Sequence, residues 1–328
     1  MKKIKGSVSA IKLKYIFIAF AVSLVALLPL RVYQLLTLVE TSSGFFAKND
    51  FTVTLIYVAV AVFTVAFLVM SYMSSHMPSS IGLPKSKNPV LAVTSLLAAL
   101  GFVYDIFKTA KDILPLNQTN PTVFMNLMKS NMDEKGGSFV ILGVIFAFFS
   151  VVYFLLFSVS HMNGSRSYKG SKILALAPMA WAMTSLITRL MRAISFVRVS
   201  ELLFEIFAFV FLMLFFMAFA RVSSGVYVEN CMWEIFGCGL SASLFVALIT
   251  IPRIVVSVFK IAAVDGHEFN FAHLGVLIFV VSYILATVGV GFKGGVETRK
   301  TVDELVLPDE NSAVVKREYI GGFDEDEN

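Results

Sequence analysis

The stretch Ser138–Phe157 reads SFVILGVIFAFFSVVYFLLF and contains twenty residues without a charged side chain. A helix of this length extends about 30 Å at 1.5 Å per residue, which matches the hydrocarbon core of a bilayer. In lipid, a single apolar segment satisfies its own backbone hydrogen bonds only as a helix. The stretch therefore predicts a transmembrane helix.

Seven further apolar stretches of similar length occupy nearly all of the remaining chain. Hydrophobic residues make up 57% of the 328 residues and charged residues only 15%, which is typical of membrane proteins and not of soluble domains. The sequence therefore predicts an all-α fold, a polytopic transmembrane helix bundle. The eight predicted spans are about Tyr15–Leu38, Thr52–Tyr72, Pro89–Ile113, Ser138–Phe157, Ile173–Ala193, Glu201–Ala220, Cys231–Ile251 and Asn270–Val290.

Several spans begin beside a residue that can cap a helix. Asn88 precedes a proline at the first helical position, where the missing N–H costs nothing. Ser138, Ser200 and Asn270 are the predicted caps of the fourth, sixth and eighth spans. About seven residues separate the fifth span from the sixth. We predict a helix–turn–helix there, with a bent or re-entrant element as the alternative.

The distribution of lysine and arginine between the loops predicts the orientation of the spans. Five lysines lie before the first span, and the loops after the even-numbered spans are also basic. The opposite side carries basic residues too, so the bias is moderate. We expect both termini to be cytoplasmic, and the short loops favour a bacterial cell membrane protein. Asn117-Gln118-Thr119, on the predicted outer side, would be a glycosylation acceptor in a secretory pathway.

Three regions are expected along the chain: a basic cytoplasmic N-terminus at 1–14, a transmembrane domain at 15–293 and an acidic cytoplasmic tail at 294–328. The tail ends in the run DEDEN. We interpret it as a disordered, solvated segment. The alternative is a docking peptide for a cytoplasmic protein partner.

The longest outer loop, Asp112–Gly137, contains a short amphipathic pattern. Phe124, Leu127, Met128 and Met132 recur in it at helical spacing. This pattern predicts a short helix that lies at the outer membrane interface or covers the mouth of a cavity.

The odd-numbered spans share one feature, since each acquires charged residues in its outer third. Arg31 lies seventeen residues after Lys14, about 25 Å along a helix, and therefore just inside the outer edge of the hydrocarbon. An arginine in mid-membrane costs roughly 2.5–3.5 kcal/mol. One arginine can extend its guanidinium into the headgroups. The same pattern on four helices favours an outward-facing polar vestibule.

Six basic residues of this set are candidate ligand-binding residues, and four acidic residues are their expected counter-charges. A net positive lining would favour a small anionic solute or a lipid headgroup. Because an unpaired charge at this depth is costly, we expect the arginines to contact carboxylates. The candidate ligand-binding residues are Arg31, Lys108, Arg189, Arg192, Arg253 and Lys260, and the counter-charges are Glu40, Asp105, Glu201 and Glu205.

A weak internal similarity suggests a repeat of two four-helix halves, 15–160 and 173–293. Arg31, Glu40 and Phe46 match Arg192, Glu201 and Phe207 at a constant offset. Four spans in each half would give both halves the same orientation, which is a parallel repeat. Few residues are identical, so a chance match is the alternative explanation.

The sequence contains no recognisable catalytic, phosphate-binding or dinucleotide-binding motif. His267 and His273 match no regular zinc pattern, and Trp181 and Trp233 are interpreted as packing residues. We expect the protein to contact the lipid bilayer. We expect no metal, cofactor or nucleic acid as a partner. Three classes remain: a permease or binding protein for an anionic ligand, a non-enzymatic membrane subunit or sensor with structural charges, and, least favoured, a membrane enzyme acting on lipid headgroups.

Overall fold

The computed structural model describes residues 13–39, 46, 50–74, 87–115, 120–165, 170–191, 199–225, 228–259 and 270–288. Within these ranges the chain forms helices and no β-strand, which confirms the predicted all-α fold. The basic N-terminus and the acidic tail lie outside the described residues. The helices are α1 (Leu13–Thr37), α2 (Phe51–Ser74), α3 (Pro89–Ile113), α4 (Pro121–Glu134), α5 (Ser138–Asn163), the 3₁₀ turn η2 (Leu174–Leu176), α6 (Ala177–Met191), α7 (Val199–Ser223), α8 (Val228–Phe259) and α9 (Phe271–Val288).

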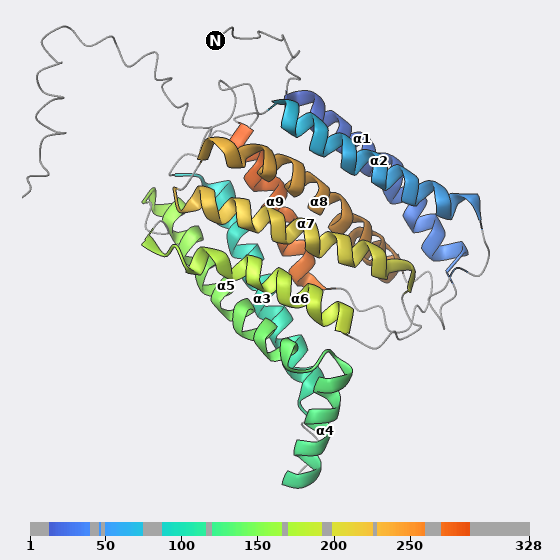
Figure 1. Cartoon of the computed structure of the whole chain (residues 1–328), viewed down its shortest axis with the longest axis vertical. Helices are drawn as coiled ribbons and strands as arrows, with labels where there is room; N and C mark the ends of the chain where they lie inside the picture. The colour runs from blue at the N-terminus through green and yellow to red at the C-terminus, as the bar shows by residue number, and fades with distance from the viewer. Residues whose placement is uncertain are drawn as a thin grey trace, which may run out of the picture.

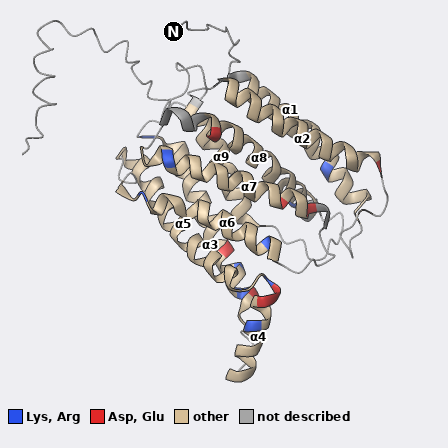
Figure 2. Cartoon of the chain, viewed as in Figure 1, with Lys and Arg blue, Asp and Glu red and all other residues tan. Residues whose placement is uncertain are grey.

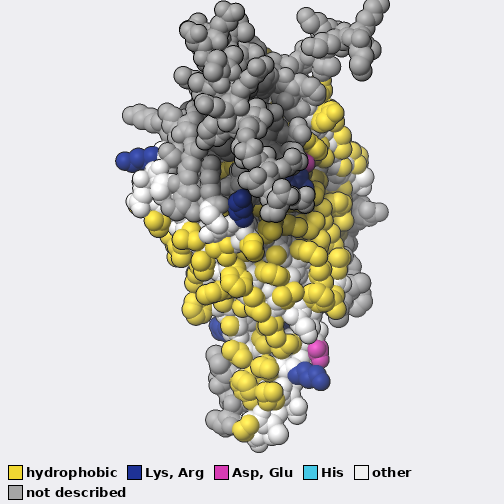
Figure 3. Space-filling view, turned by 60° about the vertical axis from the view of Figure 1, so that its left-hand side comes forward, with side chains coloured by type: hydrophobic (Ala, Val, Ile, Leu, Met, Phe, Trp, Pro, Cys, Tyr) yellow, Lys and Arg dark blue, Asp and Glu magenta, His cyan; other side chains and the backbone are white. Residues whose placement is uncertain are grey.

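Seven of the described helical segments are long and apolar enough to cross a membrane, and they correspond to the first seven predicted spans. The eighth prediction coincides with α9, which is apolar but shorter. Large apolar side chains such as Val25, Phe107 and Ile173 are exposed, and apolar side chains cover the middle of the bundle in Figure 3. Such a surface is suited to lipid. By the length and composition of these helices, the chain is a multi-pass membrane protein.

Two of the predicted helix caps are confirmed and two are wrong. Asn88 accepts a hydrogen bond from the main-chain N–H of Leu91 at 3.3 Å, and Asn270 caps α9 in the same way. Ser138 is the first residue of α5, because a glycine with positive φ precedes it and starts the helix without a side-chain cap. Ser200 lies inside α7, which begins one residue earlier.

Six helices form a closed ring in which each contacts the next, in the order α3, α5, α6, α7, α8 and α9. The hairpin of α1 and α2 lies outside this ring and packs against α8 (Figure 1). As a result α8 is surrounded by four helices, and nearly all of its apolar part is buried. A parallel repeat would relate the α1–α2 hairpin to α6 and α7. Since α6 and α7 belong to the ring, the contacts between the described helices give that repeat no support.

Aromatic side chains fill the ring towards one end of the bundle. Phe154 packs edge-to-face on Phe279, with ring centroids 4.8 Å apart, and Phe219 packs in the same way on Tyr283 at 4.9 Å. Phe157 adds further ring contacts to this core. Offset and edge-to-face aromatic pairs pack densely, so side chains fill the interior of this half of the ring.

Charged side chains gather at the two ends of the bundle and leave its middle free of charge (Figure 2). One end carries the pair Arg221–Glu234, with 3.4 Å between the guanidinium nitrogen and the carboxylate oxygen. The other end carries α4, which projects from the bundle and has no buried residue (Figure 1). The predicted amphipathic helix in this loop is therefore confirmed as a helix. Asn131 attaches it by donating a hydrogen bond to the carbonyl of Ile113.

Candidate functional site

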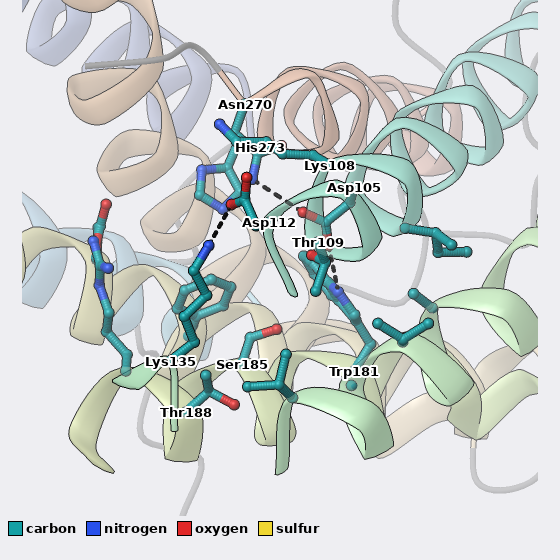
Figure 4. A pocket seen from close by; sticks show the side chains of 18 of the residues that line it. Asp105, Lys108, Thr109, Asp112, Lys135, Trp181, Ser185, Thr188, Asn270 and His273 are labelled. Carbon is teal, nitrogen blue, oxygen red and sulfur yellow. Dashed lines mark hydrogen bonds and ion pairs between the residues drawn. The ribbon is translucent and has the colours of Figure 1, made fainter. Parts of the chain in front are cut away.

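A cavity of about 470 Å³ lies inside the helix ring at the end that carries α4. All six helices of the ring contribute side chains to it (Figure 4). No residue of α4 itself lines it, so the described part of α4 does not cover its mouth; Lys135, just after α4, does contribute. The polar and aromatic lining residues are Asp105, Lys108, Thr109, Asp112, Lys135, Trp181, Ser185, Thr188, Arg189, Glu205, Phe209, Arg253, Asn270 and His273.

On α3 and on α6, helical spacing places the lining residues on a single face of the helix. On α3 the lining positions 105, 108, 109 and 112 follow the i, i+3, i+4, i+7 pattern. On α6 the lining positions 181, 185, 188 and 189 follow almost the same pattern. Each helix therefore turns a polar stripe into the ring and an apolar face to its surroundings. On α5, which faces them, small or apolar residues such as Gly143 and Ala147 leave the space open.

Two arginines and two glutamates form an alternating ion-pair network at the wall of the cavity. Arg253 pairs with Glu201, and its Nε donates a hydrogen bond to Oε1 of that glutamate at 3.2 Å. The same guanidinium lies 3.7 Å from Oε1 of Glu205, which in turn pairs with Arg189. All four side chains are buried or nearly so. The predicted pairing of outer arginines with carboxylates is confirmed for Arg189.

Asp105 is held on the opposite side of the cavity by two neutral donors. The indole N–H of Trp181 donates to Oδ2 of Asp105, and the side-chain amide of Asn270 donates to Oδ1, both at 3.3 Å (Figure 4). These bonds join α3 to α6 and to the first turn of α9. Nearer the mouth, Lys135 pairs with Asp112 at 2.6 Å, and both side chains are substantially exposed. The polar side chains of α3 are thus held by contacts with α6, with the start of α9 and with the turn after α4.

The structure brings together five of the ten predicted site residues in the cavity lining: Lys108, Arg189, Arg253, Asp105 and Glu205. Glu201 does not line it and lies behind Arg253 as its buried partner. Glu40, Arg192 and Lys260 lie outside the described residues.

Arg31 does not line this cavity. Arg31 belongs to α1, which packs outside the ring against α8, so its fully buried side chain cannot reach the cavity. Its guanidinium donates a hydrogen bond to Gln34 at 3.3 Å and lies over the ring of Phe204, 5.1 Å from the centroid. A guanidinium over an aromatic face is stabilised by the negative potential of the ring.

Among the described residues, four basic groups and three acidic groups line the cavity, so the lining itself has a small positive excess. The two kinds of group are equal in number only when Glu201, which lies behind Arg253 and does not line the cavity, is included. The basic groups are Lys108, Lys135, Arg189 and Arg253, and the acidic groups are Asp105, Asp112, Glu201 and Glu205. The cavity is therefore polar, and its charges are balanced when Glu201 behind its wall is included.

Among the lining residues without a predicted role in the site, four are informative: Trp181, Asn270, His273 and Lys135. Trp181 was interpreted as a packing residue and Asn270 only as a helix cap, yet both donate to Asp105. His273 packs edge-on against Phe209, with ring centroids 5.5 Å apart. The periodic polar stripe on α6 was a usable signal for Trp181. Lys135 lies in a turn between helices, and its position gave no such signal.

Comparison with protein-family models, with curated proteins and with solved structures finds no match for this chain. Its function is therefore inferred from the chemistry of the cavity.

Proposed function

We propose that this membrane protein is a permease or binding protein that holds a small ligand with an anionic group, a carboxylate or a phosphate, in the cavity of the helix ring. The observation that carries the proposal is convergence. Lys108, Arg189 and Arg253 come from three different helices and line one cavity. Basic residues with a purely structural role would not need to share a cavity.

The size and chemistry of the cavity support this proposal. Its volume of about 470 Å³ lies within the range of roughly 300–1,000 Å³ that is usual for small-molecule sites. An arginine has five N–H donors, and a single carboxylate partner occupies at most two of them well. The guanidinium of Arg189 lines the cavity and its side chain remains 16% exposed, so a bound anion can reach it.

A second candidate function is favoured by the ion-pair network. Glu201, Arg253, Glu205 and Arg189 neutralise one another, as structural charges in a membrane subunit or sensor would. The two functions differ in one respect. A binding protein is stabilised by its ligand, by about 2.7 kcal/mol at a concentration one hundred times Kd, whereas a structural network responds to no ligand.

The test measures thermal unfolding of the purified protein with inorganic phosphate, citrate or phosphatidylglycerol. The soluble anions and the lipid distinguish a solute from a headgroup. We expect one of the probes to raise the Tm of the wild type, and Arg189→Ala to abolish that rise. Arg189→Lys should restore only part of it, because lysine lacks the planar fork of donors. The control is Arg221→Ala, which breaks an arginine–glutamate pair at the other end of the bundle.

Two results would contradict the proposal. One is a wild-type protein that none of these anions stabilises. The other is an equal loss of stabilisation in the Arg189→Ala and Arg221→Ala variants, because the latter residue lies far from the cavity.

A further inference from the structure

Asp105 differs from the other acidic residues of the cavity, because no basic side chain pairs with it in the part of the chain that the structure describes. Its two hydrogen-bond donors, Trp181 and Asn270, are neutral. They fix the direction of the carboxylate without neutralising its charge. Lys108, one turn further along α3, attracts the carboxylate electrostatically but does not form a direct ion pair with it. The carboxylate thus remains a negative centre on the cavity wall.

Three aromatic rings line the cavity with Asp105, and one of them, Trp181, contacts it directly. Trp181 and Phe209 have ring centroids 5.8 Å apart, and Phe209 contacts the ring of His273 at 5.5 Å. All three side chains line the cavity together with Asp105. A carboxylate beside aromatic rings is a favourable environment for an ammonium group, which gains an ion pair from the one and attraction to the ring electrons from the other.

The arginines of the same cavity offer the opposite chemistry. Arg189 and Arg253 come from α6 and α8, and they present guanidinium donors to the space that Asp105 also faces. The described wall carries four basic and three acidic groups, and Glu201 behind Arg253 brings the charges in and around the cavity into balance. A ligand with a single negative charge would disturb that balance. A ligand with one positive and one negative group would keep it and would occupy both kinds of subsite.

From this arrangement we propose that the ligand is a zwitterion, whose ammonium group binds Asp105 among the aromatic rings and whose carboxylate or phosphate binds Arg189 and Arg253. This inference rests on the proposed function and names its ligand class. Two sources share the chemistry, a free amino acid or phosphoamine and the headgroup of a zwitterionic lipid.

The test compares binding of phosphoethanolamine with binding of its two halves, inorganic phosphate and ethanolamine, to the full-length protein. Glycine and acetate form a second matched set, and phosphatidylethanolamine in mixed micelles represents the lipid source. An added charge-assisted hydrogen bond should make a zwitterion bind about tenfold more tightly than the matching anion. Asp105→Asn should abolish that preference, while the anion still binds. Glu234→Gln, which removes a carboxylate at the other end of the bundle, should keep the preference.

The outcomes separate the two proposals. If phosphate or acetate binds but neither zwitterion binds more tightly, the zwitterion inference is overturned and the proposed function stands. If none of the probes binds, both fail. If Asp105→Asn keeps the preference, Asp105 is not the ammonium site and the inference is overturned. The comparison of probes on the wild type decides the matter even if that variant does not fold.

Discussion

Arg253 shows how a charged side chain is accommodated inside this bundle. Only 7% of it is exposed, and it lies between two glutamates from α7, one of which is 2% exposed. Removing such ions from water costs several kcal/mol for each, and the cost is offset only where opposite charges and hydrogen bonds are in place. The alternation of arginine and glutamate supplies both. This arrangement fixes Arg253 and Arg189 at the wall of the cavity.

Glu201→Gln should therefore destabilise the protein strongly. The substitution removes the nearer of the two glutamates beside the buried Arg253, and breaking a buried pair costs about 3–5 kcal/mol. The control is Glu234→Gln, whose partner Arg221 is 43% exposed; loss of an exposed pair costs less than about 1 kcal/mol. Denaturant or thermal unfolding in detergent measures both. Equal effects of the two substitutions would contradict this account of the network.

The crossing of α3 and α9 depends on two glycines. A Cβ atom at Gly101 would lie 2.9 Å from the carbonyl oxygen of Phe271, and one at Gly275 would lie 2.8 Å from that of Leu97. Both obstacles are backbone atoms, which cannot turn away. This close approach also brings α3 near Asn270 at the start of α9, and so supports the hydrogen bond to Asp105.

Gly275→Ala should destabilise the bundle by about 1–3 kcal/mol, as overpacking of a dense core does. Gly143→Ala on α5 is the matched control, because its new Cβ would meet Thr184 at an ordinary 3.5 Å. There the higher helix propensity of alanine should stabilise the protein by up to about 1 kcal/mol. The same unfolding measurement should therefore show a loss of stability for Gly275→Ala and a gain for Gly143→Ala. A neutral or stabilising Gly275→Ala would show that α3 and α9 do not cross this closely.

At the scale of single helices, the sequence predicted where the helices lie along the chain better than the residues at which they end. The bounds Pro89–Ile113 agree with the structure to the residue, since Asn88 and the proline mark the start. By contrast, α8 continues through Pro252 to Phe259, eight residues beyond the predicted Ile251. An apolar stretch marks where a helix crosses hydrocarbon. Its end depends instead on backbone hydrogen bonds and packing, which apolar length does not report.

For the whole molecule, the sequence could not predict which helices are neighbours. Every span offers apolar surface, and the choice of partner depends on close contacts such as those at Gly101 and Gly275. Charge at the outer ends therefore identified Arg189 and Arg253 correctly as cavity residues but included Arg31, which the α1–α2 hairpin carries outside the ring. The charged pattern reports depth in the membrane, not position around the bundle.

The orientation of the bundle gives a prediction at the same scale. If both termini are cytoplasmic, the cavity opens to the outside of the cell, opposite the end that carries Lys172. In a background with Cys231 and Cys238 replaced by alanine, a cysteine at Thr188 should react in intact cells with a membrane-impermeant maleimide. A cysteine at Lys172 should react only after permeabilisation. The reverse pattern would show that the cavity faces the cytoplasm.

The central claim is that a small charged ligand occupies the cavity of the helix ring. The most direct test is the maleimide labelling rate of Ser185→Cys, in the same background, with and without phosphoethanolamine. Ser185 lines the cavity, whereas Met125 on the projecting helix α4 is exposed and remote from it. We predict that phosphoethanolamine slows labelling of Ser185→Cys in a saturable manner and leaves Met125→Cys unaffected. Unchanged labelling of Ser185→Cys at every concentration of phosphoethanolamine, phosphate and glycine would contradict the claim.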